Sequence, residues 1–181
     1  APQLVQKGNI DYLVFDYLAE ITMSIMARAR EKDARFGYAH DFVTVTMAGI
    51  ARDVAAKKIK VVTNAGGVNP KACAEALEAL LAKQGVALKV AYVDGDDVLP
   101  ALEKWKAQGV KEMYTGAGLP EKPISMNVYL GGFPIAAALA ILLSTEYGPF
   151  AITLSLLAWA FMNCLLLSVL PRPAVCAALA L

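Results

Sequence analysis

Hydrophobic positions along the first 122 residues follow two different periods. Short apolar runs rich in β-branched residues predict buried strands, and longer stretches with apolar residues three and four apart predict helices. The predicted strands cover 10–15, 59–63, 86–93 and a shorter run at 110–114. The predicted helices cover 18–30, 42–57, 70–84 and a segment that begins after Asp96 or Asp97 and ends near 107.

Strands that alternate with helices imply parallel βαβ units joined by right-handed crossovers. The sequence therefore predicts an α/β fold, with a Rossmann-like or flavodoxin-like parallel sheet and flanking helices. Two of the helices also carry start signals: Asp41 is the expected N-cap of the second, and Asn69 followed by Pro70 that of the third, with Gly85 just past its end.

Charge divides the chain into two parts. After residue 122 the only charged side chains are Glu146 and Arg172. We expect an α/β domain over 1–140, followed by an apolar tail over 141–181. Within the tail, 150–170 has no charge, and a helix of that length spans about 31 Å, close to the ~30 Å of a bilayer interior. Shorter and less clearly amphipathic, 130–143 is expected to be a core helix.

Three explanations of the apolar tail stay open. A single C-terminal transmembrane helix at 150–170 would anchor a cytoplasmic domain to a membrane. A tail from an altered reading frame, splice or gene prediction would explain the sudden loss of charge. A buried core helix is the third, although a small domain offers little room to bury such a segment on all sides.

Net charge and cysteine content limit the function further. A formal net charge of +1 argues against nucleic-acid binding. The three cysteines show no C-x-x-C spacing and the only histidine, His40, is far from them, so neither a disulfide framework nor a Cys/His zinc site is expected, and no metal site is predicted. The first nine residues lack an apolar signal-peptide core, which favours an intracellular location.

The strongest candidate site is the loop at 64–70, between the second strand and the third helix. Asn64, Gly66, Gly67 and Asn69 lie where ligands bind in open parallel sheets. Two glycines let a ligand approach the backbone, and the helix N-terminus favours a phosphate, pyrophosphate or carboxylate. The loop matches neither G-x-G-x-x-G nor a P-loop. A tight βα turn with a good cap is the alternative.

Carboxylates follow the first and third strands. Asp16 and Glu20 would share one face if the helix began at Asp16, and paired carboxylates can divide acid and base roles. Asp94 and Asp96 belong to an acidic run that can bind a cation or ribose hydroxyls. In both places helix capping and a turn are the alternatives.

At these loops the sequence resembles the N-terminal domain of the acyclic terpene utilisation family. The resemblance covers about 1–140 and is carried by APQLV at 1–5, NIDYLVFDYLAE at 9–20, VTNAGGVNP at 62–70, VDGDD at 93–97, TG at 115–116 and NVYLGGFPIA at 127–136. It implies a role in breaking down citronellol- and geraniol-type compounds through branched acyl-CoA intermediates. Family members usually carry a strand and a glycine-rich loop before the APQLV segment and another strand with a Gly/Arg/Asp-bearing loop after about residue 140, and neither is expected in this sequence.

On this basis we expect part of an enzyme that acts on a branched acyl-CoA or a terpenoid acid, with a coenzyme A thioester as the candidate substrate and no other cofactor assigned. Asp16, Glu20 and Asp94 are the expected catalytic residues. The expected ligand-binding residues are Asn64, Gly66, Gly67, Asn69, Asp96 and Asn127. The alternatives are a membrane-tethered binding module without catalysis and an incomplete product of the family; a homo-oligomer is left open.

Overall fold

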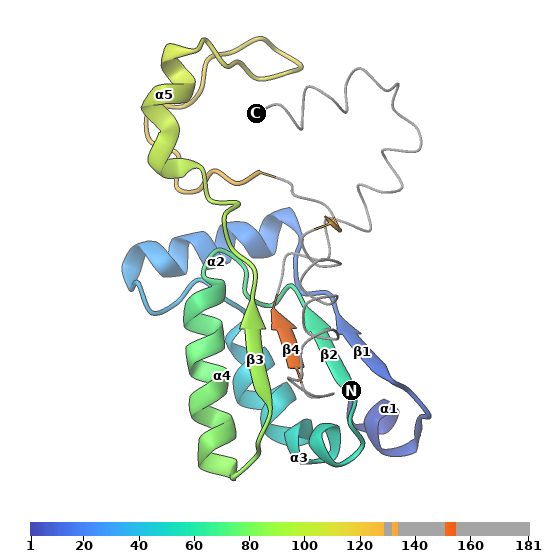
Figure 1. The fold of residues 1–181 in the computed structure, drawn as a ribbon. Coiled ribbons are helices and arrows are strands. Elements are labelled where there is room, and N and C mark those ends of the chain that lie inside the picture. The colour runs from blue at the N-terminus through green and yellow to red at the C-terminus, as the bar shows by residue number, and fades with distance from the viewer. Residues whose placement is uncertain (129–131, 134–150, 155–181) are drawn as a thin grey trace.

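The computed structural model describes residues 1–128, 132–133 and 151–154 (Figure 1). Its helices are α1 (Pro2–Lys7), α2 (Glu20–Lys32), the π-helix η1 (Phe42–Met47), α3 (Ala48–Ala56), α4 (Pro70–Gln84), the 3-10 helix η2 (Leu99–Ala101) and α5 (Leu102–Ala107). Its strands are β1 (Tyr12–Phe15), β2 (Lys60–Thr63), β3 (Lys89–Tyr92) and β4 (Ala151–Leu154).

The strands form one small parallel sheet in the order β1-β2-β4-β3. Leu13 of β1 pairs with Val61 of β2, and Val62 of β2 pairs with Thr153 of β4. Strand β4 also pairs with β3, so the last described segment of the chain lies between two strands that precede it by about 60 residues or more. The predicted α/β class with a parallel sheet and helices is confirmed.

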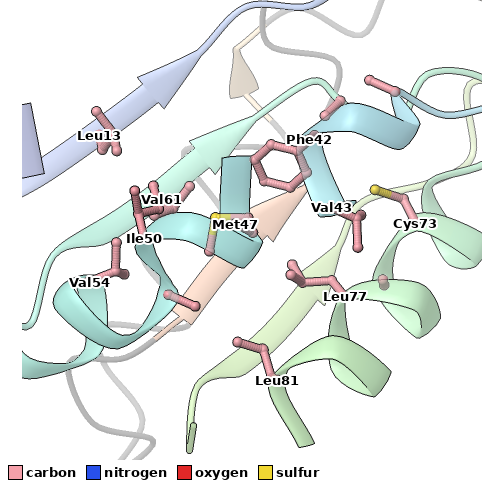
Figure 2. Close-up of a cluster of buried hydrophobic side chains, with 14 of the residues drawn as sticks. Leu13, Phe42, Val43, Met47, Ile50, Val54, Val61, Cys73, Leu77 and Leu81 are labelled. Atoms are coloured by element: carbon pink, nitrogen blue, oxygen red, sulfur yellow. The ribbon is translucent and has the colours of Figure 1, made fainter. Parts of the chain in front are cut away.

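The hydrophobic core lies between this sheet and the helices η1, α3 and α4 (Figure 2). Leu13 and Val61 point from the strands toward Met47 and Ile50, and Leu77 of α4 closes the cluster (Figure 2). All five side chains are buried, as expected where an amphipathic helix covers a sheet. Cys73 is also buried, and burial raises its pKa to about 12, which keeps it a neutral thiol.

Local signals set the ends of α4 as predicted. The Asn69 side chain accepts a hydrogen bond from the backbone N–H of Ala72 at 3.3 Å, Pro70 occupies the first turn, and Gly85 ends the helix in a left-handed conformation. The predicted helix at 42–57 is one continuous segment made of η1 and α3. Its expected cap was wrong: Asp41 has helical backbone angles and makes no side-chain capping bond.

The predicted strand at 110–114 is also wrong, because its residues turn back on themselves. The carboxylate of Glu112 accepts hydrogen bonds from the backbone N–H groups of Tyr114 and Thr115, at 3.0 and 2.5 Å. The Glu112 backbone N–H donates to Ala117 across the turn. A side chain that satisfies nearby backbone groups in this way replaces the hydrogen bonds of a sheet.

The predicted helix at 150–170 is corrected at its start, because Ala151–Leu154 form strand β4. Ile152 and Thr153 are β-branched and favour a strand, and both neighbouring strands supply a parallel partner. The rest of that segment, and nearly all of the core helix expected at 130–143, lie outside the described residues. Among the described residues no helix has the length and apolar character needed to cross a bilayer.

Phe42 provides a test of the core. Its side chain is fully buried, and its ring packs edge-on against Phe15 and Tyr17, with centroids 5.7 and 5.8 Å apart. We expect Phe42→Ala to lower the free energy of unfolding by about 3–5 kcal/mol in urea titration. Val45→Ala, in the same π-helix but 68% exposed, is the control and should change it by about 0.5 kcal/mol at most. Equal losses would contradict this core.

Candidate functional site

The carboxyl ends of β1, β2 and β3 meet at one edge of the sheet, and α2 lies across that edge (Figure 1). Every residue predicted to act in a site follows one of these strands, except Asn127. Ligands of open parallel sheets bind at this edge, because the connecting loops gather there. At this edge the described structure places the Asp16–Asn64 pair, the glycine loop at 64–70 and the Asp96–Asn127 pair.

Asp16 and Asn64 form a hydrogen-bonded pair that links the ends of β1 and β2. The Asn64 side-chain amide donates to Asp16 Oδ1 at 2.8 Å, and its oxygen accepts the backbone N–H of Tyr17 at 2.7 Å. Asp16 Oδ1 also accepts the backbone N–H of Leu18 at 3.2 Å. Asn64 is fully buried and Asp16 is exposed, so Asn64 acts as a structural link and Asp16 keeps a carboxylate oxygen toward solvent.

Tyr17 lies beside this pair and contacts the π-helix. Its hydroxyl is 3.1 Å from Thr46 Oγ1, and burial of the ring raises the pKa of the phenol above its usual value. The wider turn of a π-helix changes the direction of the side chains that follow it, and such turns are frequent at functional sites. Tyr17 therefore remains protonated at neutral pH and can donate a hydrogen bond.

The glycine loop at 64–70 is closed by protein rather than open to a ligand. Residues 64–68 are buried, and the segment at 34–39 covers them. The Val68 N–H donates to Gly37 O at 2.9 Å and the Ala39 N–H to Ala65 O at 2.8 Å. A Cβ atom on Gly66 would lie 2.9 Å from Pro70, and one on Gly67, where φ is +52°, would collide with Met26. Close packing is therefore sufficient to explain both glycines.

The backbone donors at the start of α4 are also occupied in part. The Asn69 side chain and carbonyl accept the N–H groups of Ala72 and Cys73, at 3.3 and 3.2 Å. The Asn69 amide itself donates to Ala34 O and Phe36 O. The ligand-binding roles of Asn64, Gly66, Gly67 and Asn69 stay predictions, and the contacts made by these residues are with the protein's own backbone and Asp16.

Asp96 and Asn127 hold together two segments that are 31 positions apart. The Asn127 amide donates to Asp96 Oδ2 at 2.9 Å, the Val128 N–H donates to Asp96 O, and the Val98 N–H donates to Met126 O. Only 6% of Asp96 is exposed. Burial raises its pKa above the usual value, nearby carboxylates act in the same direction, and the bond from Asn127 opposes them.

A cleft of about 340 Å³ lies next to the Asp96–Asn127 pair, between α2 and the segment at 123–127. We call it the α2 cleft; its lining residues are Ala27, Arg30, Glu31, Val68, Asp97, Leu99, Pro123, Ile124, Ser125 and Asn127. Its walls are mainly apolar, and its charged groups are Arg30, Glu31 and Asp97. A second cavity of about 200 Å³ shares Ala27, Ile124 and Ser125 with it and adds Ser24 and Arg28.

Arg30 is the central polar group of the α2 cleft. Its Nη1 donates to Val68 O at 2.6 Å and to Asp97 Oδ2 at 3.3 Å. The arginine therefore connects the glycine loop with the loop after β3. A guanidinium carries five N–H donors, and among the described residues Nη2 and Nε of Arg30 make no hydrogen bond.

The sequence did not identify Arg30 as a site residue. At the end of a predicted helix, a cation is expected for its favourable interaction with the helix dipole. The only usable signal was its position, one turn after Met26 on the face of α2 that the structure buries. Of the predicted residues, the cleft contains Asn127 and borders Asp96. Glu20 and Asp94 are exposed and make no hydrogen bond to another predicted site residue within the described ranges.

The packing of the glycine loop can be tested with two matched glycines. Gly67→Ala combines a left-handed backbone with a Cβ that meets Met26 and lies 2.7 Å from Gly37 O; Gly109→Ala has the backbone strain alone, at φ +71° with no atom within 4 Å. We expect Gly67→Ala to cost about 1–3 kcal/mol more in urea unfolding than Gly109→Ala. Equal costs would show that the loop opens freely toward solvent.

The buried carboxylate of Asp96 predicts a pH dependence. A raised pKa in the folded state means that stability is fully present below the unfolded pKa and is lost as pH rises through the folded pKa. Asp96→Asn should therefore gain stability relative to wild type between pH 3 and pH 7 in urea titrations. Asp33→Asn is the opposite control, because Arg35 lowers the pKa of Asp33 to about 2, so this variant should lose relative stability as pH rises. A difference that does not vary with pH would contradict the assignment at Asp96.

Comparison with known proteins identifies the family. The family model described as acyclic terpene utilisation family protein AtuA matches residues 1–141, which confirms the resemblance found in the loop sequences. No curated protein and no solved structure matches the chain. The match includes β1, β2, β3, the glycine loop and every residue of the α2 cleft. The chain therefore belongs to the acyclic terpene utilisation family of AtuA proteins.

Proposed function

We propose that this protein takes part in acyclic terpene utilisation by binding a branched terpenoid acyl compound, as the acid or its coenzyme A thioester, in the α2 cleft. Family membership suggests the pathway. The observation that carries the proposal is the composition of the cleft, whose lining combines apolar residues with polar ones that include Arg30 and Asn127. A ligand with an apolar chain and a polar head matches that arrangement.

The apolar walls suit a branched hydrocarbon chain. Leu99 of η2 lines the cleft together with Pro123 and Ile124 of the segment at 123–127, Ala27 of α2 and Val68 of the glycine loop. Ile124 is 47% exposed, so a bound chain would remove apolar surface from water. Each buried methylene contributes about 0.8 kcal/mol, and a branched chain of ten carbons can therefore bind mainly through these walls.

The polar residues that line the cleft offer both hydrogen-bond donors and acceptors. Arg30 and the Asn127 side chain provide donors, Ser125 provides a hydroxyl, and Asp97 provides an acceptor. Asp96 lies directly behind Asn127, and burial raises its pKa, which favours a proton-donating carboxylic acid over an ordinary carboxylate. The carboxylates among the described residues that line the cleft are Glu31 and Asp97; Asp16, Glu20 and Asp94, which follow β1 and β3, stay our candidate catalytic residues.

We also propose the doubly wound, Rossmann-like or flavodoxin-like form of the fold. Two successive connections run in one direction across the order β1-β2-β4-β3, from β1 to β2 and from β2 to β3, whereas the step from β3 to β4 runs back. With right-handed crossovers, a reversal of direction places the returning connection on the other face of the sheet. The strand order supports this arrangement.

Ligand-induced stabilisation tests the function. We expect citronellic acid, geranic acid or their coenzyme A thioesters to raise the melting temperature of the full chain in a concentration-dependent manner, because a ligand that binds only the folded state stabilises it by RT ln(1 + [L]/Kd). Acetate and free coenzyme A are the controls without a terpenoid chain. The absence of a concentration-dependent shift with all four terpenoid ligands up to millimolar concentration would rule the proposal out.

A variant then assigns the binding to the cleft. Ile124→Asp places a charge on its apolar wall and should weaken binding at least tenfold, or about 1.4 kcal/mol. Val45→Asp makes the same change at another exposed apolar position, on η1 and away from the cleft, and should bind as wild type does. Equal affinities for both variants would place the ligand elsewhere.

A further inference from the structure

We propose that the α2 cleft selects the free monocarboxylate over its thioester, with Arg30 as the residue that recognises the carboxylate and Asp97 as an internal competitor that keeps out ligands with several negative charges. This inference rests on the proposed function and specifies the substrate class of that same site. Three properties of the cleft carry it: the unused donors of Arg30, the balance of charge, and the size of the space.

The geometry of Arg30 leaves room for a second anion. Both of its hydrogen bonds come from Nη1, at 2.6 Å to Val68 O and 3.3 Å to Asp97 Oδ2. The contact with Val68 fixes the guanidinium in the cleft, and the one with Asp97 is long for a charged pair, whose usual distance is about 2.7–2.9 Å. The fork of a guanidinium matches the two oxygens of a carboxylate. A thioester carbonyl is neutral and offers the same donors a weaker acceptor.

The charge balance of the cleft disfavours phosphates. Among the described residues that line it, one cation, Arg30, stands against two carboxylates, Glu31 and Asp97. When Arg28 of the adjoining cavity is included, the charged residues that line the two cavities sum to a formal charge of zero. A single carboxylate can share Arg30 with Asp97, but a phosphate group adds more negative charge next to existing carboxylates, and like charges in contact are strongly unfavourable.

The size of the space agrees with a compact ligand. The α2 cleft and its neighbour measure about 340 and 200 Å³ and share three lining residues. Ligand pockets for drug-sized molecules span about 300–1,000 Å³; the α2 cleft lies near the lower end of that range and its neighbour lies below it. They accommodate a branched acid of about ten carbons, whereas the nucleotide part of coenzyme A would have to lie outside them.

Isothermal titration calorimetry of the full chain tests the inference with three probes that share one hydrocarbon chain: 3,7-dimethyloctanoate, its primary amide and its coenzyme A thioester. We expect the carboxylate to bind at least about tenfold more tightly than either the neutral amide or the thioester, whose phosphates are negatively charged. If the thioester or the amide binds as tightly as the carboxylate, the inference is overturned while the proposed function stands. If none of the three binds, the proposed function fails instead.

Variants of the Arg30–Asp97 ion pair distinguish recognition of the carboxylate by Arg30 from a general effect of charge. Arg30→Gln should reduce the preference for the carboxylate over the amide to about threefold or less. In Asp97→Asn the side-chain oxygen can still accept the Leu99 N–H. This variant should bind the carboxylate about three- to tenfold more tightly, and the difference in affinity between the carboxylate and the thioester should become smaller. Asp33→Asn removes a carboxylate from the exposed Arg35–Asp33 pair and is the matched control, with unchanged affinities expected.

Two results of the variant series would overturn the inference. One is an Asp97→Asn protein that binds the carboxylate no more tightly than Asp33→Asn does. The other is a folded Arg30→Gln protein that keeps the full carboxylate preference. Should Arg30→Gln fail to fold through loss of its bond to Val68, Arg30→Lys keeps the charge but not the fork, and an unchanged carboxylate preference in that variant counts equally against the proposal.

Discussion

The packing of the 34–39 segment onto the glycine loop determines the shape of the whole carboxyl edge. Two backbone hydrogen bonds, from Val68 to Gly37 and from Ala39 to Ala65, join the loop after β2 to the chain that follows α2. This approach is possible only without a side chain at position 67. Because the loop is held there, α2 is fixed across the strand ends and Arg30 reaches Val68 O. The cleft is therefore a consequence of this contact.

Elements with signals in their own sequence were the ones that could be predicted. The start and end of α4 follow from Asn69, Pro70 and Gly85, all within one or two residues of the helix ends. Strand β4 depends instead on distant partners, β2 and β3, and its apolar sequence is equally consistent with a helix. The strand predicted at 110–114 was wrong for a related reason: the Glu112 side chain accepts the backbone N–H groups that a strand would pair with a neighbouring strand.

The candidate site shows the same limit more strongly. The general location was predictable, because the topology of a parallel sheet brings the loops to one edge. Whether a glycine faces a ligand or a neighbouring methionine was not, since Gly67 looks the same in sequence in both cases. Arg30, Asp97 and Ile124 are separated by at least 27 positions, and no local pattern indicates that they share one cavity. Such a site becomes visible only in three dimensions.

The position of β4 affects how the chain is made. The gap between β2 and β3 is filled by Ala151–Leu154, about 60 residues after β3. At a synthesis rate of about 5–20 residues per second, both inner strand edges of the nascent chain lack their partner for roughly 3–12 s. Parallel pairing between distant strands forms slowly, and an unpaired strand edge can pair with another chain in the meantime. The order of the strands therefore leaves two inner strand edges of newly synthesised protein unpaired until β4 has left the ribosome.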